Sequence, residues 1–369
     1  MNKLIEIAKV FSKLGSISFG GPAAHIAMMQ DEIVSKRKWI SQQHFLDLIG
    51  ATNLIPGPNS TEMTMHCGYE RAGWKGLFVA GLCFIIPAVA ITGLFAWLYQ
   101  EYGQLPDVKP FIYGIKPAVI SIILMAAYKL GKKALKSFEL GLLGVIIITA
   151  CVFGLNEVMA IFLCGFLGLI LYLIKNRNNT INSYLPFTLF GSVPLKVGST
   201  KILLIFLKVG AILYGSGYVL FAFLDAELVG TGLLTRQELI DAVAFGQFTP
   251  GPVLSTATFI GWQLNGFWGA LVATIGIFLP SFIFVGILNP IVPKMRKYKT
   301  ISSFLDAVNI GAVAIILVVC FEMGKETITD WKMIVISLMS LIAVFAFKKL
   351  NSAFIVLFGA IAGYLLTFI

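Results

Sequence analysis

Charged residues are scarce in this 369-residue sequence. Asp, Glu, Lys and Arg make up 12% of it, whereas 58% of it is hydrophobic, and the mean hydropathy is +0.88. Soluble domains carry about twice that share of charge. Apolar runs close to the ~20 residues that a helix needs to cross a bilayer recur along the chain. The composition therefore predicts an all-α polytopic membrane protein and excludes a soluble globular domain.

Patterns for metals, nucleotides and catalysis are missing as well. The five cysteines lie in or beside apolar segments without a Cys-x-x-Cys spacing, which is typical of buried structural thiols. The three histidines form no His-Glu-x-x-His pattern, and the sequence contains no Walker loop and no Gly-rich nucleotide fingerprint. We therefore expect no enzyme activity, no metal and no cofactor, and any active transport would run on an ion gradient.

Basic residues exceed acidic ones, which gives a formal net charge of +10. Most of them cluster between apolar runs, as expected where Lys and Arg hold loops on the cytoplasmic side. We interpret this charge as a topology signal and not as a nucleic-acid surface, although a positive field would also attract an anionic substrate. No cleavable signal peptide is expected, because residues 1–13 are mixed and basic without a small-residue cleavage site.

Apolar segments fall into two groups of six around a polar linker. They lie at residues 10–30, 45–66, 73–99, 111–129, 138–155 and 157–174, and then at 202–224, 238–262, 267–290, 303–321, 331–347 and 351–368. The linker contains two prolines and a run of asparagines. We therefore expect a first repeat at 1–174, a linker at 175–200 and a second repeat at 201–369.

The two halves repeat each other at a nearly constant offset. Pro56-Gly57-Pro58 returns as Pro250-Gly251-Pro252, and Phe11-x-Lys13-Leu14-Gly15 returns as Phe206-x-Lys208-Val209-Gly210. Further matches continue along later segments: Asp47 with Asp241, Gly73 with Gly266, Gly76 with Gly269, and Pro87 with Pro280. An offset that holds across so many segments indicates that the halves are copies.

Loop charge predicts that the copies have opposite orientations. Loop 99–108 carries two acids and no Lys or Arg, whereas its counterpart, 294–299, is strongly basic. Loop 129–136 is strongly basic, and its counterpart, 322–330, holds three acids and one lysine. Equivalent loops therefore lie on opposite sides of the membrane, as in an inverted repeat. Six full crossings per half would leave the copies parallel. Either one segment per half is re-entrant or the linker adds a crossing, which leaves about 10–13 membrane segments.

Each Pro-Gly-Pro element interrupts an otherwise apolar segment. Proline lacks an N–H group and fixes φ, so two prolines around a glycine end a helix near Ile55. In a bilayer, the backbone groups that are freed must lie inside the protein or face a cavity. Broken segments at matching places in two halves point to the binding site of a transporter. A plain surface loop is the alternative, which the apolar sequence on both sides disfavours.

Four motifs at these places share a family resemblance. They are Phe19-Gly20-Gly21-Pro22-Ala23-Ala24-His25, Lys36-Arg37-Lys38-Trp39, Asn53-Leu54-Ile55-Pro56-Gly57-Pro58-Asn59 and Thr249-Pro250-Gly251-Pro252. Together they resemble the chromate ion transporter family in its long, two-domain form, over nearly the whole chain. The resemblance implies efflux of chromate across the bacterial cytoplasmic membrane, powered by the proton gradient. The second half departs from the pattern, with Gly215-Ser216-Gly217 in place of Gly-Gly-Pro and Leu220 in place of His25.

A tetrahedral dianion such as chromate or sulfate needs N–H donors, hydroxyl groups and one or two cations. The N-termini of interrupted helices supply N–H donors and a positive partial charge. We therefore expect the substrate at the two breaks and at the intramembrane Lys116. The candidate residues at the breaks are Gly20, Gly21, Pro22, Asn53, Pro56, Gly57, Pro58, Asn59, Ser60, Thr61, Gly215, Pro250, Gly251, Pro252, Ser255 and Thr256. The alternatives are close helix packing for the glycines, N-capping for the hydroxyls and snorkelling for the lysine.

Proton coupling requires a titratable group within reach of the anion. Glu62, one turn after Pro58, is the leading carboxylate, because a buried carboxylate can exchange protons near neutral pH. His25 is the second candidate, with a hydrogen-bonded core histidine as the alternative. Two further matched pairs are expected near the membrane interface: Lys13 with Lys208, and Glu32 with Glu227.

The sequence thus predicts a secondary transporter that exports chromate by alternating access, driven by the proton-motive force, with the two halves rocking around the ion. A carrier for sulfate or another oxyanion is the first alternative, and an anion channel is the second. The expected partners are the oxyanion, protons and the lipid bilayer. No nucleic acid is expected, and a homodimer is left open.

Overall fold

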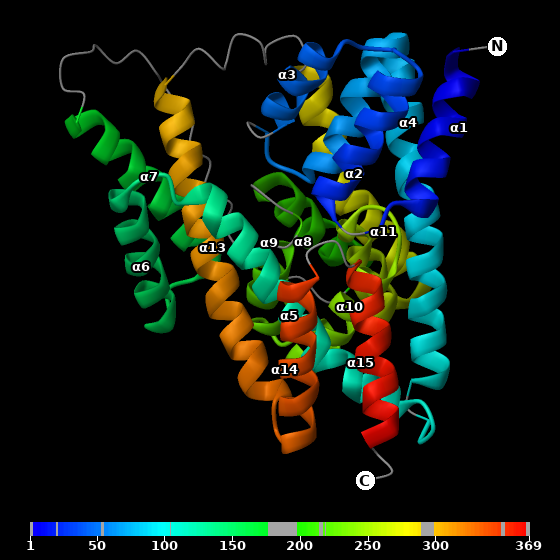
Figure 1. Ribbon diagram of the computed structural model, residues 1–369, viewed down its shortest axis with the longest axis vertical. Coiled ribbons are helices and arrows are strands. Elements are labelled where there is room, and N and C mark those ends of the chain that lie inside the picture. Colours follow the sequence, from blue (N-terminus) through cyan, green and yellow to red (C-terminus); the bar gives the residue numbers. More distant parts are fainter. Residues whose placement is uncertain are drawn as a thin grey trace.

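All regular secondary structure in the described part of the chain is helical in a computed structural model (Figure 1). The structure describes residues 3–19, 21–52, 55–103, 105–175, 198–213, 217, 219–288, 299–347 and 351–366. The helices are α1 (Lys3–Ile17), α2 (Pro22–Met29), η1 (Gln30–Lys36), α3 (Gln42–Thr52), α4 (Asn59–Tyr102), α5 (Lys109–Ala134), α6 (Phe138–Val152), α7 (Glu157–Lys175), α8 (Ser199–Ile212), α9 (Val219–Leu224), η2 (Asp225–Val229), α10 (Arg236–Phe248), η3 (Val253–Ser255), α11 (Thr256–Leu288), α13 (Lys299–Thr327), α14 (Trp331–Ala346) and α15 (Ser352–Leu366).

Helices long and apolar enough to cross a membrane number four among the described residues, and they belong to α4, α5, α11 and α13. Helices α6, α7, α14 and α15 contribute shorter apolar stretches. Large hydrophobic side chains are exposed along these helices, as expected where the surrounding medium is lipid. The prediction of an all-α membrane protein is confirmed.

Helix α4 is two helices joined by a reversal, which lies at the boundary between the predicted apolar segments 45–66 and 73–99. Its backbone leaves the helical region at Ala72 and Gly73. A Cβ atom placed on Gly68 would lie 2.3 Å from the carbonyl oxygen of Gly76, although residues eight apart in a straight helix are separated by ~12 Å. The chain therefore doubles back, and the half-length helix 59–72 packs against the start of the long helix that follows. Helix α11 repeats this reversal at the equivalent residues: Asn265, Gly266, Gly261 and Gly269.

Close backbone contacts hold the first helix of each half against the long helix of the same half. A Cβ atom on Gly15 of α1 would lie 2.4 Å from the carbonyl oxygen of Phe84 in α4. In the second half, a Cβ atom on Gly210 of α8 would lie 2.4 Å from the carbonyl oxygen of Ile277 in α11. The two long helices also pack on each other, so that α1–α4 and α8–α11 form one bundle. We call this the crossing bundle.

The remaining helices are exchanged between the halves. Helices α6 and α7 of the first half pack on α13 of the second, whereas α14 and α15 of the second half pack on α5 of the first. Helices α5 and α13 also pack on each other, and in Figure 1 these six helices occupy the left and lower front of the molecule. We call α5–α7 with α13–α15 the outer bundle. Both bundles therefore contain helices from both halves.

Contacts between the halves are reciprocal. Tyr113 of α5 donates a hydrogen bond to Asp330 at the start of α14. Asp306 of α13, the repeat equivalent of Tyr113, accepts a hydrogen bond of 2.7 Å from Lys136 Nζ. Lys136 adjoins Ser137, the equivalent of Asp330, and Ser137 and Asp330 cap α6 and α14 through their side chains. The two contacts therefore join equivalent or adjacent positions of the two halves.

The matched lysines and glutamates form the same ion pair in each half. Lys13 Nζ lies 3.8 Å from Glu32 Oε2, and Lys208 Nζ lies 2.6 Å from Glu227 Oε1. In both cases the first helix of the half is joined to the π-helical turn that follows its short second helix. The two lysines therefore tie the crossing bundle together in addition to any anchoring at the interface.

The helical reversal predicts opposite effects for two glycine-to-alanine changes. Gly68→Ala should lower the folded fraction, because its methyl group would overlap the Gly76 carbonyl and overpacking costs about 1–3 kcal/mol. Gly324→Ala in α13 is the matched control, since nothing lies within 4 Å of its added methyl group and alanine favours a helix by about 1 kcal/mol. The monodisperse fraction in size-exclusion chromatography after heating checks this. Equal losses in both variants would contradict the reversal.

Candidate functional site

The two chain breaks are bonded crosswise to the opposite half. Gly57 N–H, inside the first Pro-Gly-Pro, donates to the carbonyl oxygen of Leu213 just after α8, with an N···O distance of 2.5 Å. Gly251 N–H, inside the second, donates to the carbonyl oxygen of Ser18 just after α1, at 2.8 Å. Since Leu213 is the repeat equivalent of Ser18, the two bonds are one interaction made twice. The backbone groups freed by each break thus find partners in the other copy.

Only glycine fits at the centre of each break. Gly57 has φ +139° and Gly251 has φ +88°, in the region where L side chains are strained. A Cβ atom on Gly57 would also lie 2.1 Å from Glu62 Oε1, and one on Gly251 would lie 2.8 Å from the Cβ atom of Ala88. The flanking prolines end α3 and α10 and leave Pro58 and Pro252 as the N-caps of α4 and η3.

A carboxylate and a hydroxyl from opposite halves meet at the Gly57 crossing. Glu62 of α4 and Ser281 of α11 are both 0% exposed. Both side chains reach Gly57: a Cβ atom placed there would lie 2.1 Å from Glu62 Oε1 and 2.6 Å from Ser281 Oγ. Within the described part of the chain, neither carboxylate oxygen has a hydrogen bond of good geometry. Among the described residues no cation pairs with this carboxyl, and a buried charge without a partner is costly.

The Gly251 crossing differs chemically from the first. Thr256 stands at the repeat position of Glu62, and Ala88 at that of Ser281. The Thr256 hydroxyl donates to Val253 O at 2.8 Å, and the Thr92 hydroxyl donates to Ser255 Oγ at 3.1 Å. Hydroxyl groups therefore line the second crossing where the first has a carboxyl.

His25 is connected to the second crossing by a contact with the Ser18 carbonyl group. Its Nε2 atom is 3.1 Å from Ser18 O, the same oxygen that accepts the Gly251 N–H. The imidazole is 1% exposed, packs edge-on against Phe84 at 5.7 Å, and leaves Nδ1 without a hydrogen bond among the described residues. This contact matches the alternative of a hydrogen-bonded core histidine, and the second ring nitrogen remains available to a ligand.

Other predicted residues lie around the two crossings. Ser60 and Thr61 are buried in the first turn of α4. The N-cap residue of this helix is Pro58, and no side-chain hydrogen bond caps the helix, so neither hydroxyl acts as an N-cap. The Thr61 hydroxyl has no partner within the described chain. Gly21 is the N-cap of α2, which begins at Pro22. Three predicted residues, Gly20, Asn53 and Gly215, lie outside the described residues.

Lys116 does not join the breaks. Its Nζ atom is 3.2 Å from Asp241 Oδ1, and its side chain is 16% exposed, so it is paired with α10 and not with the Pro-Gly-Pro elements. Asp241 also accepts a 2.7 Å hydrogen bond from Tyr99. Tyr99 lies seven residues beyond Thr92 on α4, or ~10 Å along a helix. The lysine thus belongs to a second polar cluster.

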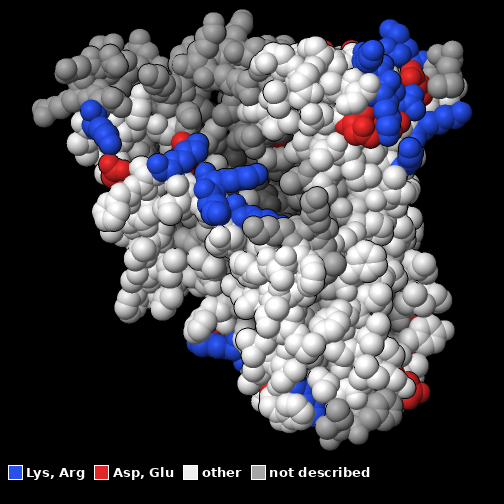
Figure 2. Space-filling model, in the orientation of Figure 1, with Lys and Arg blue, Asp and Glu red and all other residues white. Residues whose placement is uncertain are grey.

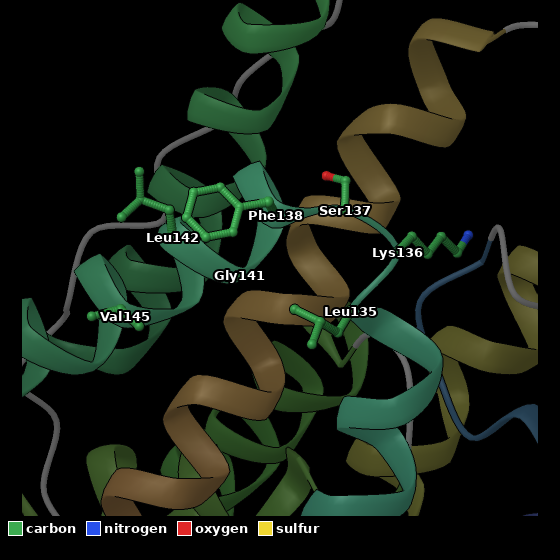
Figure 3. Close-up of a pocket in the computed structure, with 7 residues that line it drawn as sticks. All are labelled: Leu135, Lys136, Ser137, Phe138, Gly141, Leu142 and Val145. Carbon is green, nitrogen blue, oxygen red and sulfur yellow. The ribbon is translucent and has the colours of Figure 1, made fainter.

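A large surface groove at the α5–α6 junction is a poor ion site. It has a volume of about 670 Å³ and is lined by Leu135, Lys136, Ser137, Phe138, Gly141, Leu142 and Val145. Figure 3 shows the apolar side chains of α6 along it and Lys136 extending away from them. Lys136 is already paired with Asp306 of α13. The groove therefore offers an incoming anion mainly hydrocarbon walls, and lipid chains fit it better.

Sequence reasoning missed Ser281, the carbonyl groups of Ser18 and Leu213, and the pairing of Lys116 with Asp241. The carbonyl groups carry no sequence signal, because every residue has one. Ser281 had a weak signal, since it follows a matched proline and departs from Ala88 in the first copy.

Comparison with known proteins identifies the family. The family model for chromate transporters matches residues 5–169 and again residues 200–364. The chain belongs to the chromate transporter family. The model is matched once by each half, in agreement with the repeat read from the sequence.

Curated relatives of the chromate transporter family match the chain over nearly its full length. A probable chromate transport protein of Synechococcus elongatus is 32% identical over 98% of this chain and 95% of its own. The chromate transport protein of Cupriavidus metallidurans is 29% identical over 98% of this chain and 92% of its own. A chromate transport protein of Pseudomonas aeruginosa is 27% identical over 96% and 90%. No solved structure matches the chain significantly.

The crossed bonds predict that Gly251→Ala lowers the melting temperature more than Gly232→Ala. Both glycines have positive φ, +88° and +70°, so each variant carries backbone strain of about 1–3 kcal/mol. Only at Gly251 would the new methyl group also meet Ala88 and the Gly15 carbonyl, whereas nothing lies within 4 Å at Gly232. Thermal unfolding of the detergent-purified protein, followed by tryptophan fluorescence, measures the difference. Identical shifts would argue against the tight crossing.

Proposed function

We propose that this member of the chromate transporter family exports chromate or a similar tetrahedral oxyanion from the bacterial cytosol, driven by the proton gradient. The relatives named above are chromate transport proteins, and they match both halves of this chain. The observation that carries the proposal is the crossing of two broken segments beside a buried, titratable carboxyl. Secondary transporters bind substrate and coupling ion at such breaks between repeats.

The oxyanion binds, in this proposal, between the two breaks. The half-helix 59–72 begins directly after the first Pro-Gly-Pro element, and η3 followed by α11 begins after the second. Their first N–H groups and positive dipole ends are the donors that the anion would meet. Thr61 and Ser255 add buried hydroxyl groups there. Such a site holds a dianion by neutral donors and does not bind it so strongly that release becomes slow.

Glu62 carries the coupling proton in this proposal. It is fully buried, and its contact with Ser281 joins the first half to the second. Glu62 adjoins the first break, so its charge state and the occupancy of that break by an anion influence each other. His25 lies at the other crossing, where Nε2 donates to Ser18 O and the free Nδ1 of a neutral ring is a lone-pair acceptor, so it takes up a proton before it can donate to an anion.

An inverted arrangement of the repeats fits the distribution of charge. In Figure 1, α3 lies near the top, whereas its counterpart α10 lies in the lower half. Most Lys and Arg side chains visible in Figure 2 lie in the upper half of that face, several of them beside a hollow near its centre. The basic end of α5 holds Lys132 and Lys133. We assign this end to the cytosol by the positive-inside rule, and the hollow then faces the incoming anion.

Alternating access in this proposal moves the crossing bundle against the outer bundle. The sequence alone suggested that the two halves rock as separate bodies. Because α6, α7, α14 and α15 are exchanged between the halves, the halves cannot move in that way. The crossed bonds lie within one bundle. A rigid crossing bundle can therefore carry the site while its contacts with α5 and α13 change.

Uptake of chromate into energised everted vesicles tests the proposal. Accumulation that is abolished by a protonophore would support proton-driven export, and competition by excess sulfate would report how far the site discriminates between oxyanions. Sulfate uptake without chromate uptake would reassign the substrate. Downhill flux that persists unchanged after the gradient is collapsed would indicate a channel instead of a carrier.

Glu62→Gln should abolish energised accumulation and leave chromate counterflow in place. The amide keeps the size of the side chain but cannot exchange a proton, so the anion can still cross without being driven. Glu101→Gln, an exposed change at the end of the same helix, is the matched control and should accumulate chromate as the wild type does. A Glu62→Gln variant that still accumulates chromate in a protonophore-sensitive way would show that Glu62 does not carry the coupling proton.

A further inference from the structure

A buried ion pair connects the two bundles away from the crossings. Lys116 of α5, in the outer bundle, lies 3.2 Å from Asp241 of α10, in the crossing bundle, and the two side chains are 16% and 4% exposed. Lys116 also donates to Gln237 Oε1 at 2.9 Å, and Tyr99 donates to the second oxygen of Asp241. Any movement of one bundle against the other must alter this pair.

The pair lies at the wall of a cavity of about 410 Å³ between the bundles. At about 30 Å³ per water molecule, this volume holds more than ten waters, which is ample for a tetrahedral oxyanion with part of its hydration shell. The residues that line it come from α4, α5, α10, the end of α13 and α14, and its polar members include Tyr99, Lys109, Tyr113, Lys116, Gln237, Asp241, Glu326 and Thr327. This is a polar space between bundles.

An unsatisfied donor faces the same region. Thr327 is 1% exposed, lines the cavity, and has no hydrogen bond to its hydroxyl within the described chain. Glu326, a further acid at the cavity, is held by Arg236 at 2.8 Å. The positive charge of Lys116 is therefore opposed mainly by Asp241, and a ligand that replaces Asp241 would meet Lys116, the Thr327 hydroxyl and the Tyr99 phenol.

The cavity belongs to the side opposite the basic loops. The acidic loops 99–108 and 322–330 contribute Gly103, Thr327 and Thr329 to its lining. By the positive-inside rule these loops are extracytoplasmic. The ion pair thus stands between the crossings and the outer face, about two helical turns from Thr92 and Ser255.

We propose that this cavity is an exit site for the oxyanion, in which the leaving anion displaces Asp241 from Lys116. Loss of this ion pair, which we call the latch, then lets the two bundles separate at their outer end. The idea rests on the proposed export function. With no anion present, Asp241 holds Lys116 and the outer end stays closed. A dianion is a stronger partner for an ammonium group than a monoanionic carboxylate. Once it has left, Asp241 re-forms the pair and closes the route.

The repeat supports a role for the latch on one side only. Asn309 stands at the position of Lys116 in the second half, whereas the aspartate is kept as Asp47. The residue equivalent to Lys116 is therefore an uncharged amide, and the two copies differ at this position.

Binding of chromate and of sulfate to the purified full-length protein in nanodiscs, measured by calorimetry, tests the exit site. Asp241→Asn should bind the anion about 10-fold more tightly, or ~1.4 kcal/mol, because the competing carboxylate is gone. Its counterflow should be slower, because the anion is retained. Lys116→Gln should lose this binding, Lys116→Arg should keep it, and the double variant Lys116→Gln/Asp241→Asn should resemble Lys116→Gln. Lys75→Gln, an exposed change elsewhere, should match the wild type.

A purely structural ion pair predicts a different pattern. Both single variants would then lose folded protein and transport alike, and the neutral double variant would recover both. That recovery, or an Asp241→Asn affinity equal to that of the wild type, would overturn the exit site. If Asp241→Asn does not fold, the two lysine variants still separate the readings. Loss of anion binding in Lys116→Gln together with retained binding in Lys116→Arg supports the exit site, and unchanged binding in Lys116→Gln overturns it. A wild type that transports no oxyanion overturns the proposed function instead, so the two failures are distinguishable.

Discussion

The hydrogen bonds from Gly57 to Leu213 and from Gly251 to Ser18 are the constraint on which the rest of the structure depends. Each Pro-Gly-Pro ends a helix where lipid cannot satisfy the backbone. The partner for each freed N–H group is a carbonyl group at the end of the other copy's first helix. Neither half can therefore complete its own break, and two copies in contact are the smallest unit that buries both.

Departures from the repeat carry the chemistry of the two crossings. The copies share their glycines and prolines, which set the backbone path. They differ in the side chains that lie at the crossings, with Glu62 against Thr256 and Ser281 against Ala88. Two symmetric sites would bind the same ligand twice. A pair in which one site has a carboxyl and the other has hydroxyl groups can serve a proton and an anion separately.

The exchange of helices between the halves changes what can move. Because α6 and α7 pack on α13, and α14 and α15 pack on α5, a separation of the halves would expose large packed surfaces. Motion between the crossing bundle and the outer bundle disrupts far less. Lys116 and Asp241 lie at that boundary, which explains why a buried charge pair persists there without belonging to the crossings. A contact that has to break repeatedly is better made by two side chains than by a packed core.

The sequence by itself determined the membrane class, the two repeats, the breaks at Pro56-Gly57-Pro58 and Pro250-Gly251-Pro252, and Glu62 as a carboxylate beside one of them. These follow from composition, periodicity and the covalent limits of proline and glycine, which act over a few residues. Tertiary structure decided the rest. The tertiary structure alone set the reversal at Gly73, the crossed bonds and the proximity of Glu62 to Ser281. It also showed that Lys116 lies in a second polar cluster with Asp241 and not at the breaks. Those contacts join residues far apart in the chain, and the backbone carbonyl groups that complete them look the same at every position of a sequence.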